Sequence, residues 1–140
     1  MHRFQMLPCP DRAIRGTDFV ALRGMGDFMN QKYDSQMKKG VLDMLVLKLL
    51  EKEAKYGYQI IQEMKEKSGE AFLLKDGTLY PILYRLEDDG LVEGRWNGAE
   101  GKQVPRKYYE ITAKGRETLK EIVGVWTYIS KGVSKLLEET

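Results

Sequence analysis

The pattern of apolar and polar positions predicts three short helices, a β-hairpin and a long last helix. Residues 40–51 are apolar at nearly every position, interrupted only by Asp43 and Lys48. A helix that is apolar on nearly all sides is buried against more than one neighbour. This helix is therefore expected either to lie between its own core and a second chain, or to be the central core helix of a monomer. A second helix is predicted from Gln59 to Lys67, with Ile60, Ile61 and Met64 facing inward and a stop at Ser68-Gly69.

A third helix is predicted between Thr78 and Gly90. Thr78 suits the N-cap, and Pro81 is expected in the first turn, where its missing N–H loses no helical partner. Gly90 suits the left-handed position after the helix, and Leu91 can then fold back onto Leu86, as in a Schellman ending. At about 100° per residue, Leu79, Ile82, Leu83 and Leu86 share an apolar face, and Thr78, Pro81, Tyr84 and Arg85 share the opposite one, with Tyr80 on its flank.

Three helices with short connections make a helix-turn-helix arrangement. The third helix has a polar, hydrogen-bonding N-terminal end, which suits an anion and the major groove of DNA. On periodicity alone, the alternative is an ordinary amphipathic helix whose tyrosines cover neighbouring core. The segments that follow decide between the two.

Residues 91–96 and 106–112 are rich in aromatic and β-branched residues and flank a glycine-rich polar loop, which predicts a β-hairpin. Between Leu91 and Arg116, six basic residues stand against three acidic ones. Lys102 and Arg106 lie where a hairpin loop could follow a phosphate backbone. In isolation, the same loop is also typical of a solubilising hairpin.

Thr112 is expected to cap a last helix of roughly 24 residues, about seven turns. Its apolar residues are spaced alternately by three and four, which is the a/d pattern of a coiled-coil seam. Three helices and a hairpin already close a small core, so we expect this seam to pair with a second copy in a homodimer. The seam residues are Leu119, Ile122, Trp126, Ile129, Val133 and Leu136.

Composition narrows the class of protein. A chain of 140 residues fits one domain, and its net charge of +2 is too small to indicate nucleic-acid binding without a local basic face. The single cysteine, Cys9, excludes an internal disulfide framework and fits the reducing cytoplasm. No signal peptide and no membrane span are expected. Residues 1–36 are expected to form a mobile tail, and a functional start at Met29 or Met37 would leave the residues before it outside the functional chain.

An enzyme would need reactive groups that converge on one site. The only histidine, His2, and the only cysteine both lie in the expected tail. The sequence has no zinc-ligand spacing, no phosphate-binding loop and no dinucleotide-binding glycine motif, so neither a metal nor a cofactor is expected. Glu87, Asp88 and Asp89 are adjacent, and on a helix they point about 100° apart. Catalysis is therefore not expected.

Several motifs, in this order and spacing, resemble the PadR-like transcriptional regulators over about residues 37–137. They are Lys39-Gly40-Val41-Leu42-Asp43-Met44-Leu45-Val46-Leu47, Tyr56-Gly57-Tyr58-Gln59-Ile60, Gly77-Thr78-Leu79-Tyr80-Pro81-Ile82-Leu83-Tyr84-Arg85-Leu86-Glu87 with Gly90-Leu91, and Pro105-Arg106-Lys107-Tyr108-Tyr109-Glu110-Ile111-Thr112-Ala113-Lys114-Gly115. The resemblance implies a winged helix-turn-helix protein that dimerises through its C-terminal helix. It also implies a repressor, and many members release DNA when a small molecule binds.

The resemblance also implies residue roles. Thr78 and Tyr80 would lie at the groove-facing start of the recognition helix, and Tyr58 would reach a phosphate. The predicted hairpin of residues 91–112 would be the wing, and its Lys102 and Arg106 would follow the phosphate backbone. Trp126 matches a position that lines a pocket for flat aromatic compounds at the dimer interface; alternatively, it packs against the first helix of the partner. The full expected DNA-binding set is Tyr58, Lys75, Thr78, Tyr80, Tyr84, Arg85, Lys102 and Arg106.

The expected fold is therefore mainly α with a small β-hairpin. It comprises a tail (1–36), a winged helix-turn-helix DNA-binding domain (37–112) and a C-terminal dimerisation helix (113–140). The expected function is that of a dimeric repressor of a pseudo-palindromic operator in double-stranded DNA, released by a small aromatic effector. The alternative is a winged-helix module that binds another protein, for which the acidic run Glu87-Asp88-Asp89 is the best support.

Overall fold

The computed structural model describes residues 31–97 and 104–138. The chain divides into two compact units, one of Val41–Glu121 and one of Met1–Gly40 with Ile122–Thr140. Helix α2 spans Gln31–Lys39. Residues 31–36, which were expected in the N-terminal tail, are therefore helical, and the rest of that tail lies outside the described residues.

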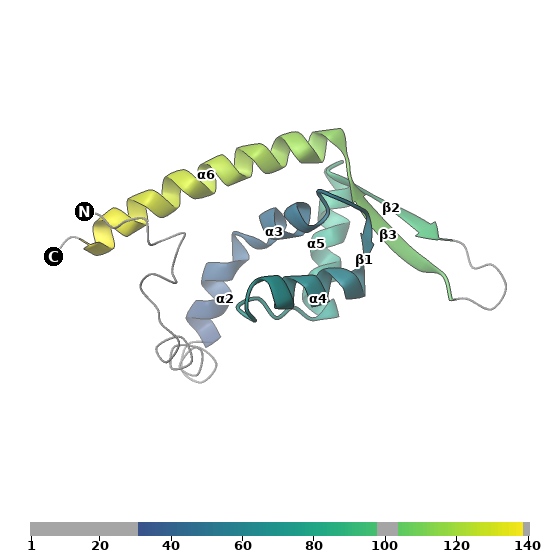
Figure 1. Ribbon diagram of the computed structural model, residues 1–140, viewed down its shortest axis with the longest axis horizontal. Coiled ribbons are helices and arrows are strands. Elements are labelled where there is room, and N and C mark those ends of the chain that lie inside the picture. The colour runs from purple at the N-terminus through teal and green to yellow at the C-terminus, as the bar shows by residue number, and fades with distance from the viewer. Residues whose placement is uncertain (1–30, 98–103, 139–140) are drawn as a thin grey trace. The chain divides into compact units, whose positions relative to one another are not determined.

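The unit Val41–Glu121 has the predicted order of helices and hairpin (Figure 1). Helices α3 (Leu42–Leu49), α4 (Gly57–Lys67) and α5 (Asp76–Asp88) contact one another, and α5 also contacts strand β2 (Val92–Asn97). Strand β3 (Arg106–Ile111) returns beside β2, and α6 (Ala113–Glu138) follows it. The mainly helical fold with a small antiparallel sheet is confirmed.

The helical part of the core comes from apolar positions that the sequence predicted, except that Ile61 is only half-buried; Val92 and Tyr109 were not predicted. All three helices and both hairpin strands contribute fully buried side chains, the largest being Leu47, Leu50, Ile60, Leu79, Leu83, Leu86, Val46, Val92 and Tyr109. Leu79, Ile82, Leu83 and Leu86 are the buried residues of α5, so its apolar face lies where the 100° period places it.

The start of α5 differs from the expectation. Lys75 is the N-cap and the helix begins at Asp76, so Thr78 lies inside the first turn, where its amide donates to the Lys75 carbonyl at 2.9 Å. Thr78 is therefore not the N-cap. Pro81 lies inside the helix, beyond the first turn, so the carbonyl of Gly77 cannot receive the usual amide four residues on. The predicted Thr78 cap and the first-turn position of Pro81 are both wrong.

The end of α5 matches the prediction. Gly90 has a φ of 77°, its amide donates to the Glu87 carbonyl at 3.0 Å, and the Leu91 amide donates to the Leu86 carbonyl at 2.9 Å. These two bonds make a Schellman ending, which satisfies carbonyls that the helix leaves open.

The sheet has three strands in the order β1-β3-β2. In the hairpin, β2 pairs with β3 from Val92 opposite Ile111 to Asn97 opposite Arg106. Strand β1 (Lys55–Tyr56) was not predicted from the sequence. It pairs with the other edge of β3 and places Tyr56 opposite Tyr108. The hairpin tip, with Lys102, lies outside the described residues.

The joint between α5 and α6 is closely built. The Thr112 hydroxyl accepts from the Gly115 amide at 2.9 Å, which confirms it as the cap of α6, and it donates to the Gly90 carbonyl at 2.7 Å. The Lys114 ammonium donates to the Asp89 carbonyl at 3.0 Å. A Cβ added at Gly115 would lie 2.1 Å from the Leu91 carbonyl oxygen. This joint therefore requires glycine at position 115.

Candidate nucleic-acid interface

The outer face of α5 is the surface that the sequence assigned to DNA. Thr78, Pro81, Tyr84 and Arg85 are all exposed there, as predicted, and Lys75 is exposed at the N-cap. Asp76, which was placed before the helix, occupies its first turn. A carboxylate at that position interacts favourably with the helix dipole but repels a phosphate, so the end of α5 attracts anions less than its sequence suggested.

Tyr80 lies elsewhere. Its side chain is half-buried, and a Cβ added at Gly57 would meet its hydroxyl oxygen at 2.2 Å and its Cζ at 2.8 Å. The ring therefore packs directly on the backbone at the start of α4. Burial, with a smaller contribution from Asp76, raises the pKa of Tyr80 above its ordinary value. The structure thus gives Tyr80 a packing role between α5 and α4.

Arg85 is engaged within the chain as well. Its guanidinium donates to the Asp43 carboxylate of α3 at 2.5 Å, although both side chains remain partly open to solvent. The exposed Tyr58 hydroxyl on α4 accepts from the Gln62 amide at 2.9 Å. Tyr58 thus lies at the surface, as the phosphate contact implied by the resemblance requires.

The wing holds its cations against aromatic rings. The Arg106 guanidinium lies 4.5 Å from the centre of the Tyr56 ring, which in turn meets Tyr108 edge-on at 5.3 Å between centroids. The Lys107 ammonium lies 5.3 Å from the Tyr109 ring and 3.5 Å from the Glu87 carboxylate. Contacts between a cation and an aromatic face are each worth about 0.5–1 kcal/mol at exposed sites, so they favour one position for each side chain.

The acidic run at the end of α5 is partly structural. One Glu87 carboxylate oxygen accepts from the Gly94 amide at 3.2 Å, while the other pairs with Lys107. Glu87 therefore ties α5 to both strands of the hairpin. This weakens the case for the run as a docking site for another protein.

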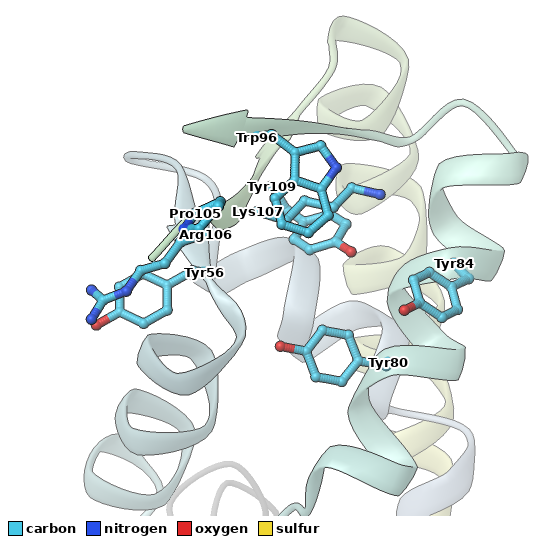
Figure 2. A pocket seen from close by; sticks show the side chains of 8 residues that line it. All are labelled: Tyr56, Tyr80, Tyr84, Trp96, Pro105, Arg106, Lys107 and Tyr109. Atoms are coloured by element: carbon cyan, nitrogen blue, oxygen red, sulfur yellow. The ribbon is translucent and has the colours of Figure 1, made fainter. Parts of the chain in front are cut away.

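A cleft of about 390 Å³ separates α5 from the wing (Figure 2). Figure 2 shows Tyr80 and Tyr84 projecting from one helix and Arg106 lying along Tyr56. The residues that line the cleft are Tyr56, Tyr80, Tyr84, Trp96, Pro105, Arg106, Lys107 and Tyr109. Burial, followed by Tyr84 and Glu87, raises the pKa of Tyr109 to about 12, so its hydroxyl is a neutral donor at any ordinary pH.

Four residues of this surface were not predicted from the sequence: Tyr56, Trp96, Lys107 and Tyr109. Lys107 and Tyr109 are two residues apart on β3, and that spacing would have placed them on one face of the strand. Tyr56 had no comparable signal, because β1 is only two residues long.

Most of the predicted seam on α6 belongs to the unit that contains Ile122–Thr140. Trp126, Ile129, Val133 and Leu136 are exposed, Trp126 by 43%, and Ile122 is half-buried. Leu119 is only 4% exposed and belongs to the unit Val41–Glu121. Its side chain is already covered within the chain, so the expectation that Leu119 contacts a partner needs correction.

Two absences hold for the part of the chain that the structure describes. None of its helices is long and apolar enough to cross a membrane. Within residues 31–97 and 104–138, no three histidine, cysteine or carboxylate side chains gather where they could hold a metal ion.

Comparison with known proteins agrees with this geometry. The sequence profile of the transcriptional regulator PadR-like family matches residues 46–121. The negative transcriptional regulator PadR of Bacillus subtilis is 33% identical over 79 residues, which are 56% of this chain and 43% of that protein.

Solved structures extend the likeness to most of the chain. A PadR family regulator from Eggerthella lenta superposes with a TM-score of 0.70 at 33% identity, covering 81% of this chain and 96% of that one. A PadR-like regulator from Bacillus cereus gives 0.64 at 37% identity, covering 75% and 99%. The chain belongs to the PadR-like family, whose members are DNA-binding transcriptional regulators and not enzymes.

Proposed function

We propose that this protein is a homodimeric repressor that places the outer face of α5 in the major groove of its operator and the wing along the adjacent phosphates. The observation that carries the proposal is the exposed polar face of α5, beside a hairpin whose Arg106 is held in place by Tyr56. A helix of this kind reads base edges, and a cation on the wing binds the backbone whatever its sequence.

The proposed contacts are narrower than the set predicted from the sequence. Thr78 and Tyr84 on α5 are the candidates for base contacts, while Tyr58, Lys75 and Arg106 are candidates for phosphate contacts. Lys102 stays a phosphate-contact prediction that rests on the sequence alone. Tyr80 and Arg85 are set apart, because the Tyr80 ring packs on the backbone at Gly57 and the Arg85 guanidinium is already paired with a carboxylate.

Repression is supported by the B. subtilis relative, which is named a negative transcriptional regulator. Dimerisation is supported by the exposed apolar stripe of α6, since isolated exposed side chains of this size are ordinary but a continuous stripe favours a partner. A symmetric dimer presents two copies of α5, which fits a pseudo-palindromic operator.

The proposal also includes a small aromatic effector that binds at Trp126 and releases the DNA. Trp126 offers an exposed indole on the seam, and a flat ring can stack on it. Release of DNA by such a compound, with Trp126→Phe less responsive than the parent protein, would support this part.

The test is fluorescence anisotropy with DNA from upstream of the protein's own gene, over a salt series and with unrelated DNA as competitor. We expect binding that survives the competitor. Arg106→Gln should flatten the slope of log affinity against log salt by about one, because one phosphate contact is lost.

Lys131→Gln is the matched control, since it removes one positive charge from an exposed position on α6, away from the winged helix in sequence. It should leave the slope unchanged. Equal slopes for all three proteins would remove Arg106 from the interface. No binding even at low salt would instead favour the protein-binding alternative.

A further inference from the structure

Arg85 and Asp43 form the one described side-chain pair that joins α5 directly to α3 through opposite charges. The Arg85 Nη2 donates to Asp43 Oδ1 at 2.5 Å across 42 residues of sequence. Both groups remain accessible: the Arg85 side chain is 53% exposed and that of Asp43 is 34% exposed. The pair therefore lies at the surface, where a competing anion could reach it.

Arg85 lies on the surface that is proposed to bind DNA. Arg85 comes seven residues after Thr78, which is about two helical turns, so the two share one flank of α5. That flank is part of the outer face proposed to enter the groove. A free guanidinium there would contact phosphates, and such contacts strengthen binding to every DNA sequence alike.

We infer that Asp43 is a specificity-determining residue: by holding Arg85 against α3, it keeps this cation off the phosphate backbone and so limits affinity for unrelated DNA. An exposed ion pair of this kind is weak, but its carboxylate also repels phosphate, so the two effects act in the same direction. Loss of the carboxylate frees one cation for the backbone. The inference rests on the proposed DNA-binding function.

The experiment compares wild type, Asp43→Asn, Arg85→Gln and the double variant in anisotropy titrations against unrelated DNA at several salt concentrations. Asp43→Asn should bind about three- to tenfold more tightly at about 0.1 M salt, with a slope steeper by about one, since one more counterion is released. Arg85→Gln should bind no more tightly than wild type, because it leaves the Asp43 carboxylate unpaired near the phosphates. The double variant should lose the gain, because the freed cation is absent.

Glu51→Gln is the matched control. Glu51 follows α3 and pairs with Lys48 at 2.7 Å, so this variant also removes one negative charge and frees one cation, but on a pair that does not involve α5. It should leave binding near the wild-type value. An equal gain for Glu51→Gln would reduce the effect to net charge and overturn the inference.

Other outcomes separate the inference from the function on which it rests. Wild-type binding with an unchanged Asp43→Asn overturns the role of Asp43 alone. Weaker binding by the double variant than by wild type, although the carboxylate is gone, would show that Arg85 already contacts DNA, which also overturns it. No DNA binding by wild type overturns both. If Asp43→Asn fails to fold, Asp43→Ser removes the same charge with a good residue for the first turn of a helix.

Discussion

Tyr109 shows how one side chain serves both the core and the surface. It pairs with Lys55 on one side and Gly94 on the other, it is only 1% exposed, and its ring edge lines the cleft beneath Lys107. A Cβ at Gly94 would lie 3.1 Å from this ring. Tyr109 is thus fixed by packing, and the position of Lys107 depends on it.

The raised pKa of Tyr109 predicts alkaline sensitivity. Its folded pKa is about 12, whereas an unfolded tyrosine titrates near 10. As pH rises from 10, the unfolded chain loses this proton first, so the free energy of unfolding falls by up to about 2–3 kcal/mol by pH 12. Tyr109→Phe should show a smaller fall between pH 9 and 11 in urea unfolding.

The exposed Tyr58→Phe is the control for this measurement. It removes a phenol hydroxyl from the surface instead of the core, so it should follow the wild-type pH dependence. A Tyr109→Phe curve parallel to that of wild type would mean that the buried hydroxyl does not resist ionisation.

At the scale of elements, the glycines of α6 give a matched pair. Gly115 has the Leu91 carbonyl and Ile111 where a Cβ would go, whereas Gly124 has no atom within 4 Å. Gly115→Ala should therefore destabilise the fold by about 1–3 kcal/mol through overpacking. Gly124→Ala should stabilise it by about 0.5–1 kcal/mol, because alanine restricts the unfolded chain and favours helix. Chemical unfolding of both variants checks the signs, and a neutral Gly115→Ala would show that the joint can open without cost.

The sequence predicted the elements where local chemistry decides them. The buried face of α5, its Gly90 ending and the Thr112 cap all follow from residues close together in the chain. Strand β1 could not be predicted, because two residues carry no period and its pairing with β3 reaches across more than 50 residues. Thr78 was misassigned as the cap because Asp76 and Gly77, although poor helix formers, continue the helix toward Lys75.

The candidate site follows the same rule. Exposure of Thr78, Tyr84 and Arg85 was predictable from the helical period. The partner of Arg85 was not, because Asp43 lies 42 residues away and only tertiary packing brings it near. Tyr80 was placed on the flank of α5 correctly, but its contact with Gly57 depends on how α4 packs.

At the scale of the whole molecule, the proposed dimer can be tested with charge. Ile129→Glu, on the predicted seam, should give monomers in light scattering, since a carboxylate buried between two helices is costly. DNA affinity should fall with it, because two half-sites are no longer bound together. Tyr128→Glu adds the same charge to a more exposed neighbouring position and should stay dimeric. A monomeric wild type would remove the dimer from the mechanism.

The joint at Thr112 also has a mechanical consequence. The cap and first turn of α6 contact the end of α5 in three places. Two are hydrogen bonds, from Thr112 to the Gly90 carbonyl and from Lys114 to the Asp89 carbonyl. The third is the close approach of Gly115 to the Leu91 carbonyl, which leaves no room for a Cβ. Because these contacts leave little freedom between the two helix ends, we expect the ends to move as one rigid unit. A rotation of the start of α6 is therefore expected to rotate α5, the helix proposed to read DNA, by the same amount.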